Sequence, residues 1–565
     1  MASDAGVSAG PAGTTEPGSI NKGGPQSDIV SPSALIYFDD YDYVDAWVEM
    51  GQERIRVRKV SHQGVIDAPS KRTIEVAHMK DDFPVLRKHF SWMEGEKLMP
   101  YQAMVGKITT EIGAHLKAGP NNRPLLPHVK GLLSSGVIEA CSRRGGARGR
   151  GVILNAAFSV KKKKPGHLRF ILSCRKLNKM LKSTGARIPP CRLPSYREIV
   201  DRLMTCSFFR EHDFKSYFFQ FELDERVRDL FAFRVGPKKY RMRRWPMGYG
   251  PVPQVSQAVS ETLAVCATDS GRGVQVTWLD NVVLGAMTRA DLLEMDLRFQ
   301  ALCERYGVTI GESSEAGARG QILGMEIDLE AKRWRLSPEW IQKTVAWSDV
   351  LDFDGSLPLR LWWRLIGSCL WRRHALSQPI RRMIALLRWM SEVAKAELQE
   401  GPSDGNWDRL VYMGEEARSC LRAELTLLRN NEWQKWSPPP EKIVDVVSDA
   451  SLTAWAFVFQ DQPTWSKFEG SWATSRTDIF RKEAFAAARA IEHVLATEEG
   501  CFRIRIGIDN SAVIAAFTRA YTLNMDALEA IDKVLTLAAE RGCVVEPYWV
   551  PTDKNIADKY TRLDR

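Results

Sequence analysis

Long hydrophobic runs, CxxC cysteine pairs and the pattern of a secretory signal peptide are not found in this sequence of 565 residues. No apolar run approaches the roughly 18 residues that suggest a membrane-spanning helix. The N-terminus lacks a basic stretch followed by an apolar one, so we expect no signal peptide. The ten cysteines are scattered between Cys141 and Cys543 without a CxxC pair, which argues against a zinc site or a disulfide framework. These absences predict a soluble, intracellular protein of the cytoplasm or nucleus, without a membrane partner.

Length and charge suggest several packed units and a polyanionic partner. The chain is too long for one hydrophobic core, and its apolar fraction of 44% is ample for globular packing. Its net charge of +10 favours binding to a polyanion. Composition and periodicity divide the chain into five parts. These are a disordered leader (1–32), an N-terminal extension (33–97), a β-rich mixed unit (98–340), a helical unit (341–436) and a terminal unit that begins at the SPPPE linker (437–565).

The terminal unit contains four acidic residues, each in a distinct local pattern. Asp449 and Asp509 follow β-branched runs, Glu483 opens an Ala-rich amphipathic pattern, and Asp558 lies near a last helix. Acids at two strand ends and on two helices can converge on one point. Such a group of carboxylates can hold two divalent cations, which activate water and stabilise the leaving oxygen during phosphodiester hydrolysis. We therefore expect a two-metal nuclease site.

Two further aspartates have similar surroundings in the mixed unit. Asp213 ends an aromatic strand, and Asp280 occupies the tip of a tight turn between two β-branched runs. Between them, a Pro-Met-Gly turn leads into a helical pattern. A strand end beside a hairpin tip again allows two carboxylates to share metal ions, here with a triphosphate and a primer terminus.

These patterns, in this order, resemble the reverse transcriptase–ribonuclease H proteins of retroelements from about residue 125 onward. The resemblance implies an α+β fold: a right-hand polymerase with fingers, palm and helical thumb or connection, followed by an RNase H-like mixed-sheet domain. It implies that Asp213 and Asp280 bind metal and that Phe218 excludes a ribose 2′-hydroxyl. Met247 and Gly248 would support the templating pair, and Arg169 would bind the incoming triphosphate.

The same resemblance implies the cofactors and partners. Each active site would use two Mg²⁺ or Mn²⁺ ions. The metal ligands would be the six acids named above: Asp213, Asp280, Asp449, Glu483, Asp509 and Asp558. The partners would be an RNA template, an RNA/DNA hybrid, a DNA primer and deoxynucleoside triphosphates, with a separate recombinase or integrase. The Asp-Asn hairpin and the nuclease directly behind the polymerase look most like tyrosine-recombinase elements of the DIRS and VIPER type.

The polymerase motif departs from the family pattern at several positions. Asn281 replaces the second aspartate of the hairpin, and Trp278 replaces a tyrosine. Ser313 stands where relatives often carry a lysine thought to protonate pyrophosphate. The nuclease lacks a histidine near Pro551, where Asp553 is the nearest polar residue. We expect the polymerase to be weakened. The chain can alternatively be a nucleic-acid scaffold, or a ribonuclease H whose polymerase half only positions the hybrid.

Two basic features have open interpretations. Lys161 to Lys164 can grip phosphates, act as a nuclear signal, or simply form a solvated turn. In the helical pattern at 358–395, tryptophans at helical spacing are more often core than groove contacts. The better phosphate candidates in this region are its arginines: Arg364, Arg372, Arg373, Arg381 and Arg382.

Overall fold

A computed structural model describes most of the chain beyond the first 64 residues. The expected disordered leader, most of the N-terminal extension, Lys163 and Lys164 lie outside the described residues. None of the ten cysteines forms a disulfide. No helix in the described part is long and apolar enough to cross a membrane. The described ranges are 65–66, 72–103, 123–141, 153–162, 166–183, 185, 191–268, 271–345, 356–378, 380–397, 409–470, 478–522 and 524–562.

The first large sheet has six strands in the order β1-β4-β3-β6-β7-β2. Its central strands β3 and β4 pair in antiparallel register, from Ala156 opposite Ser173 to Lys161 opposite Leu168. Helix α5 packs on β2. The strands are β1 (Val65–Ile66), β2 (Ile138–Ala140), β3 (Leu154–Lys161), β4 (His167–Ser173), β6 (Ala232–Val235) and β7 (Lys238–Met242); the short helices near them in the sequence include α2 (Val76–Asp82), α3 (Arg87–Phe90), α5 (Val129–Ser134) and α6 (Arg175–Ser183).

The second sheet carries the two aspartates of the mixed unit. Its order is β10-β5-β9-β8, and helices α8 and α9 pack on it. A smaller antiparallel sheet has the order β11-β12-β13-β16. Its first three strands follow β10 in the sequence, and its fourth strand, β16, comes from much later in the chain. The elements are α7 (Tyr196–Leu203), β5 (Phe208–Phe214), α8 (Val252–Thr268), β8 (Gly273–Trp278), β9 (Asn281–Ala286), α9 (Arg289–Arg305), β10 (Ile310–Ser313), β11 (Arg319–Ile322), β12 (Met325–Asp328), β13 (Arg333–Leu336) and β16 (Gln434–Lys435).

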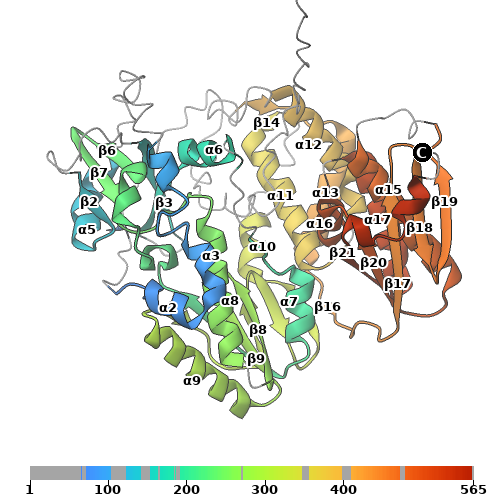
Figure 1. Cartoon of the computed structure of the whole chain (residues 1–565), viewed down its shortest axis with the longest axis horizontal. Helices are drawn as coiled ribbons and strands as arrows, with labels where there is room; N and C mark the ends of the chain where they lie inside the picture. Colours follow the sequence, from blue (N-terminus) through green and yellow to red (C-terminus); the bar gives the residue numbers. More distant parts are fainter. Residues whose placement is uncertain are drawn as a thin grey trace, which may run out of the picture.

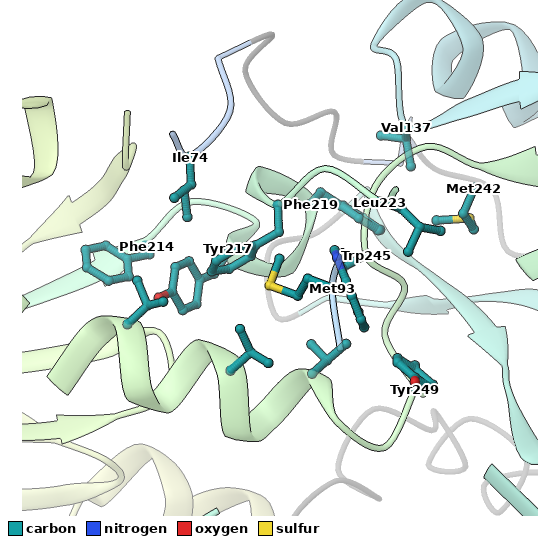
Figure 2. Packing of buried hydrophobic residues seen from close by; sticks show 14 of the residues in the cluster. Ile74, Met93, Val137, Phe214, Tyr217, Phe219, Leu223, Met242, Trp245 and Tyr249 are labelled. Atoms are coloured by element: carbon teal, nitrogen blue, oxygen red, sulfur yellow. The ribbon is translucent and has the colours of Figure 1, made fainter. Parts of the chain in front are cut away.

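A continuous hydrophobic core, rich in aromatic residues, supports this second sheet and joins it to the first (Figure 2). The tilted rings of Phe214 and Tyr217 pack with their centroids 4.8 Å apart. The Tyr217 hydroxyl donates to the backbone oxygen of Ser256 and accepts from Ser260, both on α8. Because a buried phenol needs hydrogen-bond partners, these contacts fix the chain directly after Asp213 onto α8.

Four helices connect the sheets to the C-terminal part of the molecule. Figure 1 shows α11 and α13 in yellow and tan between the green sheet and the orange-red one. Their core includes Trp362 and Trp363, which are buried, so these tryptophans are core residues. The helices are α10 (Pro338–Val345), α11 (Leu359–Ala375), α12 (Ile384–Glu397) and α13 (Glu415–Asn430), with a two-stranded β14 (Leu357–Pro358) and β15 (Leu410–Val411) pair between them.

The C-terminal sheet is mixed, in the order β19-β18-β17-β20-β21. The pairs from β19 to β17 are antiparallel, and β17, β20 and β21 are parallel. Helix α15 packs on β17 and β18, and α17 packs on α15 and β21. The elements are β17 (Ile443–Ala450), β18 (Ala454–Phe459), β19 (Gln462–Lys467), α15 (Ile479–Thr497), β20 (Arg503–Ile508), α16 (Ser511–Arg519), α17 (Met525–Glu540), β21 (Val544–Trp549) and α18 (Asp558–Thr561). The expected α+β fold with a terminal mixed sheet is confirmed.

Candidate active sites

The four terminal acids come from four different elements. Asp449 lies near the end of β17, and Asp509 directly follows β20, the parallel neighbour of β17. Glu483 is on the second turn of α15, which packs on β17. Asp558 begins α18, which also packs on β17. Because parallel strands end at the same edge of a sheet, Asp449 and Asp509 stand side by side.

Electrostatic coupling shows that these acids share one environment. Burial, and then repulsion by Asp509 and Asp449, raises the pKa of Glu483 to about 8. Burial also raises the pKa of Asp449 to about 6, with smaller contributions from Asp509 and Asp558. Only 6% of Asp449 and 8% of Glu483 is exposed. Carboxylates that repel one another in this way favour a compensating positive charge.

Two threonines that the sequence did not reveal position these carboxylates. Thr552 Oγ1 donates to Asp509 Oδ2 at 2.9 Å, and Thr561 Oγ1 donates to Asp449 Oδ2 at 2.7 Å. Thr552 lies one residue before Asp553, which the sequence suggested as the nearest polar residue in this loop. Each hydroxyl fixes one carboxylate oxygen and leaves the other oxygen of the same group for a ligand.

The donor set suits a hard divalent cation. Mg²⁺ and Mn²⁺ prefer oxygen ligands, and all four side chains are carboxylates. Glu483 Oε2 is buried without a hydrogen-bond partner, which is costly unless a cation binds there. Among the described residues, no group of three Asp, Glu, His or Cys side chains has the geometry of a metal site. The four carboxylates are therefore neighbours whose side chains would have to change rotamer to bind the same metal ion.

The second pair of acids lies at the tip of the β8–β9 hairpin and on the adjacent strand. Asp213 on β5 pairs across the sheet with Asn281, the first residue of β9. Asp280 lies in the two-residue turn, where Leu279 has a φ of 55°. Gln257 and Ser260 of α8 bind the backbone nitrogen and oxygen of Leu279 at 2.7 and 2.6 Å. Helix α8 thus holds this unusual turn in place.

The charges around Asp213 and Asp280 match a site for phosphates and cations. Burial and then repulsion by Asp280 and Glu312 raise the pKa of Asp213 to about 7. Burial also raises the pKa of Asp280. The positive charges of Lys162 and Arg169 partly offset this rise in the pKa of both aspartates. Arg169 therefore lies near the two acids. The sequence did not single out Glu312, because it follows a glycine in a short edge strand without a recognisable motif.

Among the predicted nucleotide-contacting residues, Phe218 is accessible, and the turn with Met247 and Gly248 packs tightly against β4, the strand of Arg169. Phe218 is partly exposed between the buried Tyr217 and Phe219. Gly248 has a φ of 103°, and a Cβ atom there would lie 2.5 Å from the backbone oxygen of Leu172 on β4. Only glycine fits this approach. Asn178 donates to Gly248 O at 2.9 Å and accepts from Gly250 N, fixing the turn that contains Met247.

Ser313 belongs to a hydrogen-bonded network beneath the β5 strand. Its Oγ lies 2.8 Å from Nδ1 of the fully buried His212. His212 Nε2 lies 2.7 Å from Asp296 Oδ1 on α9. The residue that replaces the expected lysine therefore helps to attach β10 to β5. The sequence did not predict this network, because His212 lies about 100 residues before Ser313 in the chain.

The prediction that Arg372 and Arg373 contact phosphates is wrong. Both residues are 4% exposed. Arg373 Nε donates to Glu424 Oε2 at 2.9 Å, and Arg372 also lies within ion-pair distance of Glu424. Glu424 on α13 is itself buried. The pair joins α11 to α13, and a buried charge needs such a partner. At these two positions, the arginines form ion pairs inside the helical unit.

Comparisons with known proteins identify retroelement relatives. No protein-family model matches the chain. Over 142 residues, 25% of the chain, it is 25% identical to the "Retrovirus-related Pol polyprotein from transposon 412" of Drosophila melanogaster, and it spans 11% of that polyprotein. The similarity is to a retroelement Pol protein and covers a quarter of this chain.

Solved structures of a foamy viral protease-reverse transcriptase are also similar. One is in complex with an RNA/DNA hybrid, with 14% identity, a TM-score of 0.43, and coverage of 79% of this chain and 57% of that chain. Another, in complex with dsDNA, has 15% identity, a TM-score of 0.43 and coverage of 77% and 84%. At these TM-scores, the assignment of function depends on the geometry of the two acidic sites.

Proposed function

We propose that this protein is an RNA-directed DNA polymerase with RNase H activity, encoded by a retrotransposon. The observation that carries the proposal is the convergence of Asp449, Glu483, Asp509 and Asp558 from four elements. The second pair, Asp213 and Asp280, supports the polymerase half. Two Mg²⁺ or Mn²⁺ ions at each site would supply Lewis-acid stabilisation of the attacking and leaving oxygens.

The side chains of the chain itself would bind and orient the substrates. Arg169 and Lys162 would bind the triphosphate of a deoxynucleotide, because their positive charges lie close enough to Asp213 and Asp280 to lower the pKa of both carboxyls. Phe218 would exclude a ribose 2′-hydroxyl, and the turn at Met247 and Gly248 would support the templating pair. In the nuclease, Thr552 and Thr561 would keep the Asp509 and Asp449 carboxylates in their binding orientation.

The hairpin sequence favours a particular type of element. Asp280-Asn281 and a nuclease directly behind the polymerase favour the tyrosine-recombinase DIRS and VIPER type, with a separate recombinase or integrase completing integration. The neutral Asn281 also supports a second function, in which a degenerate polymerase half only binds the hybrid for the ribonuclease H.

Primer extension on an RNA template separates these two functions. The wild-type chain would be incubated with a DNA primer and deoxynucleotides, in Mg²⁺ and in Mn²⁺, beside Asp280→Ala. Extension by the wild type alone supports the polymerase. Absence of extension by both proteins, with hybrid cleavage retained, supports the ribonuclease-only function. Extension that survives in Asp280→Ala would overturn the polymerase site.

A further inference from the structure

An exposed tryptophan stands next to the nuclease acids. Trp549 is the last residue of β21, pairs with Ile508 in the parallel β20 strand, and is 60% exposed. Asp509 follows Ile508 directly. Single exposed apolar side chains are ordinary on protein surfaces, so exposure alone assigns no role to Trp549. Trp549 differs from other exposed apolar residues because its side chain is hydrogen-bonded to Asp509.

The indole is bonded to the backbone of a site residue. Trp549 Nε1 donates to the backbone oxygen of Asp509 at 3.2 Å. This bond uses the only donor of the side chain and fixes the orientation of the ring. Thr552 binds the Asp509 carboxylate from the following loop. The exposed ring surface is therefore apolar and held rigidly beside Asp509.

The proposed substrate has a surface that matches such a ring. An A-form-like duplex has a wide, shallow minor groove that displays sugars and 2′-hydroxyls. For the acids to reach a phosphodiester of the RNA strand, adjacent sugars must pass over the protein surface beside Asp509. A fixed apolar ring can pack against the C–H face of a ribose and loses little conformational entropy on binding.

We propose that Trp549 is a sugar-packing platform that positions the RNA strand of an RNA/DNA hybrid beside Asp509. The inference rests on the proposed ribonuclease H activity and adds a substrate-positioning residue to it. Phe at this position would keep a flat apolar ring and lose the hydrogen bond to Asp509. Ala would lose both. The two substitutions therefore separate sugar packing from support of the Asp509 loop.

Trp465 provides a matched control in the same sheet. It lies on β19, at the opposite edge from β21, and is 44% exposed. Trp465→Ala removes an exposed indole of the same domain without touching the strands that carry Asp449 and Asp509. Thermal melting of each full-length variant would check that its fold is intact.

The test is single-turnover cleavage of the RNA strand in a labelled hybrid, measured against the concentration of full-length protein in Mg²⁺. We expect Trp549→Ala to raise the half-saturating concentration about tenfold, which corresponds to a loss of about 1.4 kcal/mol of binding free energy. Trp549→Phe keeps an apolar ring and should raise it by less than about threefold. Trp465→Ala should match the wild type.

The contrary outcomes are distinct. If Trp549→Ala matches the wild type, or if Trp549→Phe is impaired as much as Trp549→Ala, the sugar-packing role is overturned, and the proposed ribonuclease activity stands. If the wild-type chain leaves the hybrid intact while it still extends a primer, the ribonuclease activity and the platform are overturned together.

Discussion

Asp213 on β5 lies directly opposite Asn281 on β9, so a carboxylate and an amide face each other, where the hairpin motif that the sequence resembles has two acids. The pairing places the neutral side chain beside the acid whose pKa is raised to about 7. The site therefore has less negative charge for metal ions than a hairpin with two aspartates.

Restoring that charge should accelerate polymerisation. Asn281→Asp adds a carboxylate next to Asp213 and should strengthen Mg²⁺ binding, with about a tenfold gain in extension rate for each 1.36 kcal/mol of added transition-state stabilisation. Asn281→Ala, which removes the amide oxygen, is the matched control and should be slower than the wild type. Primer-extension rates at several Mg²⁺ concentrations measure the effect. A slower Asn281→Asp would show that the amide is adapted to this site.

Sugar selection should depend on Phe218. Its ring is partly exposed while its neighbours Tyr217 and Phe219 are buried, so Phe218→Ala opens space without emptying the core. The variant should incorporate ribonucleotides more readily relative to deoxyribonucleotides, because a bulky wall discriminates through the transition state. The ratio of the two kcat/KM values is the measurement. An unchanged ratio would place Phe218 outside the nucleotide pocket.

The C-terminal domain should lose stability as the pH rises when metal is absent. The pKa of Glu483, at about 8, lies above its usual range, so the folded state holds this proton more tightly than the unfolded state. Its contribution is fully present at low pH and is lost as the pH rises towards 8. Melting temperatures in EDTA should therefore fall between pH 5.5 and pH 8.5 more for the wild type than for Glu483→Gln. Equal falls would mean that Glu483 is not buried among acids.

Arg373 should matter for stability and not for nucleic-acid binding. Arg373→Ala leaves the buried Glu424 charge without its closest partner, a change that typically costs about 3–5 kcal/mol. Arg388, which is exposed and bonded to Glu529, is the control; its loss should cost about 1 kcal/mol or less. Urea unfolding measures both costs. The dependence of primer–template affinity on salt concentration should be the same in Arg373→Ala as in the wild type. A shallower slope of log affinity against log salt concentration would show that Arg373 contacts phosphate.

The sequence predicted the elements of both sites better than their supporting contacts. Asp213, Asp280, Asp449 and Asp509 each end or follow a β-branched or aromatic run, and such runs mark strands reliably. Thr552 and Thr561 carry no such signal, because a hydroxyl that orients a carboxylate depends on folding that brings distant segments together. The same limit explains Arg372 and Arg373, whose partner Glu424 lies about 50 residues farther along the chain.

Cleavage of the RNA strand in an RNA/DNA hybrid by the wild type and by Asp509→Asn tests the central claim most directly. Asp509 lies beside Asp449, accepts the Thr552 hydroxyl and contributes to the raised pKa of Glu483. We predict Mg²⁺- or Mn²⁺-dependent cleavage by the wild type, none by Asp509→Asn, and primer extension retained in that variant. Full cleavage by Asp509→Asn would contradict the assignment of these four acids as the ribonuclease H site.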